Sequence, residues 1–208
     1  MEQKSKWSRI AGDFEKRVNY VAGERNIEAI QTALAAQSLT GKVLELGCGN
    51  GTFSASLAPR ADRLYVTDVS DQMLSVCRDR LTHLGNVEVE KQDCFELSYP
   101  DSNFDFVVMV NLLHVIPEPE KAIRESKRVL RANGKILIVS FTTEGMRLLG
   151  KLGMAYRYLR AFGKPPEKSR TLTVATTKSM LEEQGFQTED ARLIGVTCKA
   201  VFVRATVN

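Results

Sequence analysis

Apolar and polar residues alternate along most of this chain in a way that predicts a repeated strand–helix order. Short β-branched or apolar runs, each typical of a strand, lie at 42–46, 63–67, 87–91, 104–110 and 135–141. Between them, apolar residues recur at helical spacing after Thr52, after Ser70, which we expect to cap its helix, and after Pro117. This order predicts parallel strands with helices on both faces of the sheet.

The two ends of the chain depart from this pattern. Residues 8–20 and 23–36 predict two helices before the first strand, and residues 145–162 predict a long helix after the fifth. A short helix and an antiparallel hairpin are then expected near 177–184, 187–195 and 198–206.

No linker-like stretch interrupts the chain, so we predict a single domain, 1–208. Its expected parts are a helical N-terminal lid, a core, a variable insertion that caps the substrate, and a closing helix and hairpin, at 1–36, 40–142, 145–175 and 176–208.

Composition and charge exclude several classes of protein. The 208 residues are 43% hydrophobic and 26% charged, which is ordinary for a globular protein and excludes a disordered chain. No apolar run approaches the roughly 18 residues of a membrane span, and residues 1–20 lack the apolar core of a secretory signal. Four scattered cysteines then favour a cytoplasmic location and no metal site. A net charge of +4 is too small to indicate a nucleic-acid partner by itself.

The glycine-rich segment after the first strand is the most informative part of the sequence. Gly47, Gly49 and Gly51 alternate at the carboxyl end of the strand, where glycine permits positive φ and close approach of a ligand to the backbone. The helix that follows is expected to offer free N–H groups and its positive dipole end. Ligands of doubly wound sheets bind outside the carboxyl ends of the strands, so we expect a ligand site here.

Acidic residues stand at the same ends of neighbouring strands. Asp68 ends the second strand, where its carboxylate could accept both hydroxyls of a ribose, and Asp93 follows the third, where it could bind the exocyclic amine of an adenine. The alternative is a tight turn with solvated aspartates. Because Glu45, the glycines and both aspartates lie in register, we favour a nucleoside site.

These segments resemble the class I S-adenosylmethionine-dependent methyltransferases of the small ubiquinone/menaquinone-methyltransferase type. The resemblance covers residues 40–142. It rests on Glu45-Leu-Gly-Cys-Gly-Asn-Gly51, on Asp68, on Gln92-Asp-Cys94, on the strand from Phe104 to His114, and on Glu125 to Leu137. Ala132-Asn133 replaces the usual Pro-Gly of the last segment, and asparagine tolerates the left-handed conformation that such a turn needs.

The resemblance implies a fold and a cofactor. The fold is a doubly wound, Rossmann-like α/β domain with a mostly parallel seven-stranded sheet, strand order 3-2-1-4-5-7-6, and an antiparallel C-terminal strand. The cofactor is S-adenosylmethionine, which leaves as S-adenosylhomocysteine. Glycines 47 and 49 would lie against its methionine part, which Glu45 would orient, while Asp68 would hold the ribose and Asp93 the adenine. The predicted cofactor residues are Glu45, Gly47, Cys48, Gly49, Asp68, Val69, Met73, Asp93, Cys94 and Asn111.

A nicotinamide-dependent dehydrogenase is the main rival for this strand order. Its fingerprint, G-x-G-x-x-G, differs from the spacing here, and Glu45 suits an amine better than a diphosphate. Asn111-Leu-Leu-His114 replaces the Asn/Asp-Pro-Pro-aromatic motif of amino-methylating nucleic-acid enzymes. No cysteine follows a proline, as cytosine-C5 enzymes require, and we predict neither a nucleophilic role for Cys48 nor a magnesium-binding carboxylate cluster.

His114 is the candidate catalytic base. Methyl transfer from a sulfonium is an in-line displacement in which the protein supplies mainly proximity, and a base helps only where the acceptor must lose a proton. His114 follows the fourth strand, near where the methyl group should emerge. The alternative is a residue that lines the pocket or satisfies the backbone.

Residues 145–178 carry eight basic side chains and one acidic one. Apolar residues from Leu148 to Phe162 fall in one helical arc, outside which the basic residues lie. The favoured interpretation is a lid helix that buries this arc on the core. The alternatives are a cap admitting an apolar or anionic substrate, an interfacial helix on an anionic membrane, and a phosphate-binding patch for RNA. Phe14, Tyr20 and Tyr156 are the predicted lid or substrate residues, and packing of the N-terminal helix on the sheet is the alternative for the first two.

We therefore predict methyl transfer to a small, apolar or anionic molecule. An RNA-modifying methyltransferase that uses residues 145–178 and a non-catalytic cofactor-binding partner protein remain as alternatives. Peripheral membrane contact is compatible with the sequence, a nucleic-acid partner is disfavoured, and the oligomeric state is not predicted.

Overall fold

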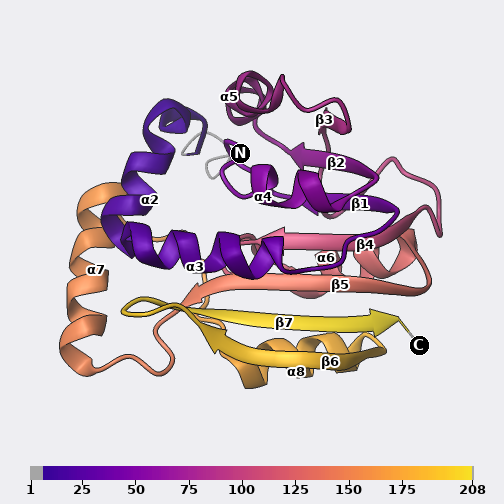
Figure 1. The fold of residues 1–208 in the computed structure, drawn as a ribbon. Coiled ribbons are helices and arrows are strands. Elements are labelled where there is room, and N and C mark those ends of the chain that lie inside the picture. The colour runs from indigo at the N-terminus through magenta and orange to yellow at the C-terminus, as the bar shows by residue number, and fades with distance from the viewer. Residues whose placement is uncertain (1–6, 208) are drawn as a thin grey trace.

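Seven strands form a single sheet in the computed structural model, which describes residues 7–207. They are β1 (Lys42–Leu46), β2 (Arg63–Asp68), β3 (Val87–Lys91), β4 (Phe104–Val110), β5 (Leu130–Thr142), β6 (Phe186–Ile194) and β7 (Lys199–Val207). Their order is β3-β2-β1-β4-β5-β7-β6 (Figure 1). The first five strands are parallel, whereas β7 runs antiparallel to both β5 and β6. The predicted fold class and strand order are confirmed.

The helices lie close to their predicted positions. They are α2 (Phe14–Ala22), α3 (Glu24–Ala35), α4 (Ser54–Leu57), α5 (Asp71–Leu81), α6 (Pro119–Val129), α7 (Leu148–Phe162) and α8 (Val174–Glu183). Ser70 caps α5 as expected, because its hydroxyl oxygen accepts from the Met73 amide at 3.3 Å. The helix predicted over 8–20 is interrupted by a 3-10 turn at Ala11–Asp13, and the part of the predicted lid before residue 7 lies outside the described residues.

Strand β5 is longer than predicted because the expected turn is a bulge within it. Leu130 pairs with Phe104, and the next pairing joins Lys135 to Phe106, so β5 carries extra residues between the two pairs. Asn133 adopts φ +61° there. The left-handed asparagine inferred from the sequence is confirmed.

Side chains of β4 alternate between two apolar layers. Val108 and Val110 join a cluster with Leu34 of α3 and Leu74 of α5. On the other face, Val107 and Met109 pack with residues of α6 and α8, including Ile123 and Leu181. Burial on both faces explains why this strand is almost continuously apolar.

Helices α2 and α7 stand beyond the carboxyl ends of the parallel strands, at the left of Figure 1. The glycine turn and the acidic strand ends point toward this edge of the sheet, which is where the candidate site lies.

Candidate cofactor site

The glycine turn adopts a backbone that only glycine accepts readily. Gly47, Gly49 and Gly51 have φ of +69°, +56° and +77°. A Cβ on Gly47 would lie 2.6 Å from Leu112 Cδ1, and one on Gly51 would lie 2.8 Å from Cys77 Sγ. All three glycines therefore adopt a backbone that other residues rarely accept, and a Cβ on Gly47 or Gly51 would also force a neighbouring side chain to move.

The helix behind the turn is shorter than the sequence suggested. Helix α4 is a single turn of four residues, so its dipole contributes little to binding an anion. The turn is instead tied to β2, because the Cys48 amide donates to the Thr67 carbonyl at 2.9 Å and the Gly49 amide donates to Asp68 Oδ2 at 3.0 Å. The charge at this site is set by carboxylates rather than by a helix end.

Glu45 is the most unusual group at the site. It lies in β1, is 1% exposed, and its Oε2 atom has no hydrogen-bond partner among the described residues. Burial raises the pKa of the Glu45 carboxyl to about 7, an effect that the nearby Ser54 hydroxyl opposes and the charge of Asp68 reinforces. A buried acceptor without a donor costs free energy. A ligand that carries an amine would supply the missing hydrogen bond to Glu45 Oε2.

Asp68 organises the second strand end. Its two carboxylate oxygens accept from the Gly49 amide at 3.0 Å and from the Ser70 amide at 2.9 Å. Burial raises the pKa of Asp68, and the amides that bind the carboxylate oppose this effect. Each carboxylate oxygen has two lone pairs, so both retain capacity to accept from ligand hydroxyls.

Asp93 begins a tight turn directly after β3. Its Oδ1 accepts from the Phe95 amide at 3.0 Å, and residues 93 and 96 form an isolated bridge. The neighbouring Cys94 is buried in the apolar cluster that also contains residues of α6. Met73 on α5 is also buried, as a residue packed near a bound ring should be, while Val69 is half-buried between Asp68 and the cap of α5.

Comparison with known proteins agrees with this geometry. Residues 44–138 match the family model described as a methyltransferase domain. This match, the relatives and the fold together support a class I S-adenosylmethionine-dependent methyltransferase. The cofactor is accordingly S-adenosylmethionine, as the sequence predicts. The orphaned carboxylate oxygen of Glu45 suits its ammonium group, and the acceptors at Asp68 and Asp93 suit its ribose and adenine.

Relatives of this methyltransferase act on different acceptors. The chain is 37% identical over 115 residues to a phosphatidylethanolamine N-methyltransferase from Cereibacter sphaeroides, covering 53% of this chain and 55% of that protein. It is 30% identical over 165 residues to a ubiquinone/menaquinone biosynthesis C-methyltransferase UbiE from Pseudomonas putida, covering 70% and 64%. The chain thus spans less than two thirds of these relatives. The structure of a possible histamine N-methyltransferase from Thermotoga maritima has the same fold, with a TM-score of 0.75, 20% identity and coverage of 98% and 99%.

Cys48 of the methyltransferase is a buried structural residue. Its Sγ lies 3.9 Å from Cys77 Sγ, beneath the glycine turn. Burial raises the pKa of the Cys48 thiol well above its ordinary value, and the neighbouring Cys77 adds to this effect. A thiol that resists ionisation is a poor nucleophile.

Asn111 closes the end of β4. Its amide donates to the Val139 carbonyl at 2.7 Å, and its side-chain oxygen accepts from the Phe141 amide at 2.9 Å. Asn111 adopts φ +58°, which asparagine tolerates better than most residues. The structure thus gives Asn111 a strand-closing role, and its contact with the cofactor remains a prediction.

His114 lies in the loop after β4, against β5. Its Nδ1 is 2.8 Å from the Ser140 hydroxyl, and its carbonyl accepts from the Arg170 amide. Burial lowers the pKa of His114 to about 4, so the imidazole is neutral at pH 7. A neutral imidazole is able to accept a proton, but one with so low a pKa is a weak base.

Ser140 was not predicted from the sequence, although it orients His114. The only signal was a polar residue within an apolar strand, and its partner lies 26 residues away. The contact depends on the register between β4 and β5, which the sequence alone did not give.

An aromatic cluster covers the glycine turn. Phe14 of α2 packs with Trp7 and Phe162 at centroid distances of 6.1 Å each. Phe14 also lies 3.7 Å from the position of a Cβ on Gly49, so this predicted lid residue reaches the site. Tyr20 and Tyr156 do not share this position, because their side chains are 46% and 61% exposed on α2 and α7.

The expectation that α7 buries its main apolar arc on the core is wrong. The residues of this arc are exposed, namely Leu148, Leu149, Leu152, Ala155, Tyr156 and Leu159, whereas Phe162 at its edge is half-buried. A different face of the helix packs on the domain, because α7 has a second set of apolar residues that the arc did not include.

Metal ligands and membrane spans bear on the predicted partners. No cluster of three or more metal-ligating side chains occurs in residues 7–207. Within the same range, no helix is long and apolar enough to cross a bilayer.

Proposed function

We propose that this chain transfers a methyl group from S-adenosylmethionine to a small acceptor with an extended apolar part. The observation that carries the proposal is the buried Oε2 atom of Glu45, which has no hydrogen-bond partner among the described residues. Asp68 and Asp93 stand at the carboxyl ends of the next two strands, on the same edge of the sheet. The acceptor class is taken from two relatives whose names refer to phosphatidylethanolamine and to ubiquinone and menaquinone.

The residues of the chain have separate tasks in this reaction. The cofactor supplies a methyl group already activated on a sulfonium. Glu45 Oε2 would accept from the ammonium group, and Gly47 and Gly49 would leave room for the methionine part. Asp68 would hold the ribose hydroxyls, and Asp93 would accept from the adenine amine. With both ends of the cofactor held, the remaining requirement would be an acceptor in line with the methyl group.

Water exclusion and proton transfer fall to other residues. Phe14 and its aromatic partners cover the glycine turn. His114 Nε2 is the candidate proton acceptor, with Ser140 holding the opposite nitrogen. Because the pKa of His114 is low, it would serve only methyl acceptors that lose a proton readily. Orientation of the acceptor would then supply most of the rate enhancement.

Calorimetric titration with S-adenosylmethionine and S-adenosylhomocysteine tests the cofactor site. We expect micromolar binding that Asp68→Ala weakens by about 1–3 kcal/mol, the cost of losing hydrogen bonds to a charged group. Asp71→Ala is the matched control, because Asp71 lies three residues away, is exposed and forms a surface ion pair with Lys91. Binding of a nicotinamide cofactor instead would contradict the proposal.

Turnover is tested by S-adenosylhomocysteine formation with quinol and phospholipid acceptors in detergent. Methylation of either class is the expected result. Cofactor binding without turnover on any acceptor would instead support a non-catalytic, cofactor-binding protein.

A further inference from the structure

Helix α7 has two apolar faces, and one of them packs against the rest of the domain. Met154 Sδ lies 3.7 Å from Cys198 Sγ, and Phe162 packs against Trp7, Phe14 and Tyr158. Ala161 on the same side is buried. This face anchors α7 to α2 and to the β6–β7 hairpin.

The opposite face is apolar and exposed to solvent. It consists of Leu148, Leu149, Leu152, Tyr156 and Leu159, which we call the leucine face. At 100° per residue these five positions fall in an arc about 100° wide. Leu149 is 83% exposed and Leu148 71%. Single exposed leucines are common, but five large apolar side chains gathered on one helix mark an interaction surface.

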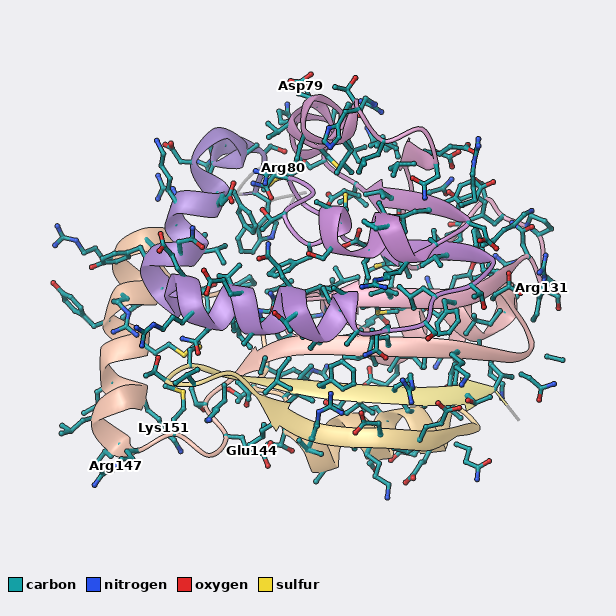
Figure 2. The ribbon with its side chains drawn as sticks, viewed as in Figure 1. Asp79, Arg80, Arg131, Glu144, Arg147 and Lys151 are labelled. Carbon is teal, nitrogen blue, oxygen red and sulfur yellow. The ribbon has the colours of Figure 1, made fainter. Side chains whose placement is uncertain are left out.

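Basic residues flank the leucine face on both sides. On the helical wheel, Arg160 lies about 20° beyond Leu149, and Lys151 lies about 60° from Leu148 on the other side. Arg147 is the extended N-cap residue that precedes the first turn of α7. All three are exposed, and within residues 7–207 none of them forms an ion pair. Figure 2 shows Arg147 and Lys151 at the same end of α7.

The segment that contains α7 and runs on into α8 carries the excess positive charge of the chain. Residues 145–178 hold eight basic side chains and one acidic one, while the whole chain has a net charge of +4. The rest of the chain is therefore net acidic. A strongly basic segment in an otherwise acidic chain indicates a partner of negative charge.

A shallow hollow extends the basic surface onto α2. It has a volume of about 390 Å³ and is lined by Asp13, Lys16, Arg17, Tyr20, Arg160 and Ala161. Three of these six residues are basic, and Tyr20 adds an exposed aromatic ring. A phosphate group beside the leucine face would find cationic side chains there.

We propose that α7 is an interfacial helix that docks this protein on the surface of an anionic lipid bilayer. The leucine face enters the boundary between headgroups and acyl chains, and Arg147, Lys151 and Arg160 contact lipid phosphates. The inference rests on the surface of α7 and the adjoining part of α2, and it does not require the acceptor proposed above. Since α7 stands beyond the carboxyl ends of the parallel strands, docking brings the edge that carries the site toward the bilayer (Figure 1).

Other partners fit this surface less well. A second copy of the chain would bring two strongly basic segments together, which like-charge repulsion opposes. RNA would use the basic residues and leave the leucines in water.

Flotation with phospholipid vesicles tests the proposal. We expect the protein to bind vesicles of phosphatidylcholine with roughly 30% phosphatidylglycerol, to bind phosphatidylcholine alone much more weakly, and to dissociate as salt is raised. Leu149→Ser with Leu152→Ser should weaken binding at least about tenfold, because the apolar area that enters the bilayer is lost. Arg147→Gln with Lys151→Gln should also weaken it about tenfold or more.

Two double variants serve as matched controls. Leu149→Met with Leu152→Met keeps the apolar face and should bind as the unaltered protein does. Arg60→Gln with Arg124→Gln removes the same charge from exposed positions outside the segment and should have little effect. Titration with S-adenosylhomocysteine, expected to be unchanged in every variant, separates loss of docking from loss of the folded site.

Three results would overturn the proposal. The first is absence of vesicle binding, or binding that the serine variants leave unchanged. The second is a dimer in light scattering that the serine variants dissociate, without vesicle binding. The third is salt-sensitive RNA binding that the glutamine variants abolish and the serine variants preserve, again without vesicle binding.

Discussion

At the scale of single residues, the candidate site contains a buried carboxylate oxygen, Glu45 Oε2, that has no hydrogen-bond partner among the described residues. Glu45 lies in a strand that is buried on both faces, and its neighbours Leu44 and Leu46 pack in the apolar layer on the other face of the sheet. Its own burial is unfavourable for a charge, which is why its pKa rises to about 7. Carboxyl groups with a strongly raised pKa are concentrated at ligand and catalytic sites, which makes Glu45 a candidate ligand-binding residue.

The titration of Glu45 gives a prediction about binding and pH. A bound ammonium group favours the ionised carboxylate, so affinity for S-adenosylmethionine should rise as pH increases toward 7 and then level off. At about pH 6 binding should release a proton, which calorimetry detects as a binding enthalpy that depends on the ionisation enthalpy of the buffer. Glu45→Gln should bind more weakly and lose this buffer dependence. Equal enthalpies in all buffers for the unaltered protein would contradict the prediction.

The same raised pKa sets the direction of one contribution to stability. Without cofactor, the folded state binds the Glu45 proton more tightly than the unfolded state, whose pKa is the ordinary 4.5. This contribution therefore declines as pH rises from 4.5 through about 7. Bound cofactor should offset the decline.

At the scale of elements, glycine has opposite roles in the glycine turn and in α7. Gly47 adopts φ +69°, and a Cβ there would collide with Leu112. Gly150 lies in α7 on an exposed helical backbone, and a Cβ there meets only Met146 Cε at 3.5 Å. The first glycine is needed for the shape of the turn, whereas the second costs helix stability.

These surroundings predict opposite effects for the same substitution. Gly150→Ala should raise the free energy of unfolding by about 0.5–1 kcal/mol, because alanine loses less backbone entropy in a helix. Gly47→Ala should lower it by about 2 kcal/mol or more, since left-handed strain and the contact with Leu112 add together. Urea unfolding followed by circular dichroism measures both. A neutral Gly47→Ala would show that the turn does not need its left-handed backbone.

At the scale of the whole molecule, a buried asparagine joins the two ends of the chain. Asn26 of α3 is 3% exposed. Its Oδ1 accepts from the amides of Val196 and Thr197 at 2.8 and 3.2 Å, and its Nδ2 donates to the Ala22 carbonyl and to the Thr197 hydroxyl. One side chain thus attaches the N-terminal helices to the turn between β6 and β7, some 170 residues away.

Removal of this link should destabilise the domain. Asn26→Ala removes the acceptor of the Val196 and Thr197 amides and should lower the free energy of unfolding by about 1–3 kcal/mol. The control Glu28→Ala, an exposed position on the same helix, should change it by no more than about 0.5 kcal/mol. Thermal and urea unfolding measure both variants. Equal midpoints for Asn26→Ala and the unaltered protein would exclude the proposed link.

Most of the fold followed from local patterns. Strands β1 to β4 lie where the apolar runs predicted them, and Ser70 caps α5 as its position implied. The bulge of β5 was not predicted. Asn133 indicates a left-handed residue, but it does not show whether the chain after it continues to pair with β4. Similarly, Tyr20 falls on a predicted helix, yet only neighbouring helices determine that its side chain is exposed.

The sequence by itself determined the features that depend on nearby residues: the alternation of strands and helices, the glycine turn, and the placement of Glu45, Asp68 and Asp93 at strand ends. Tertiary structure decided which of the two apolar faces of α7 is buried, which hydroxyl holds His114, and how Asn26 joins both ends of the chain. The reason is physical. The spacing of apolar residues predicts which face of a helix or strand is apolar. Whether that face is buried depends on other elements that folding brings from distant parts of the chain.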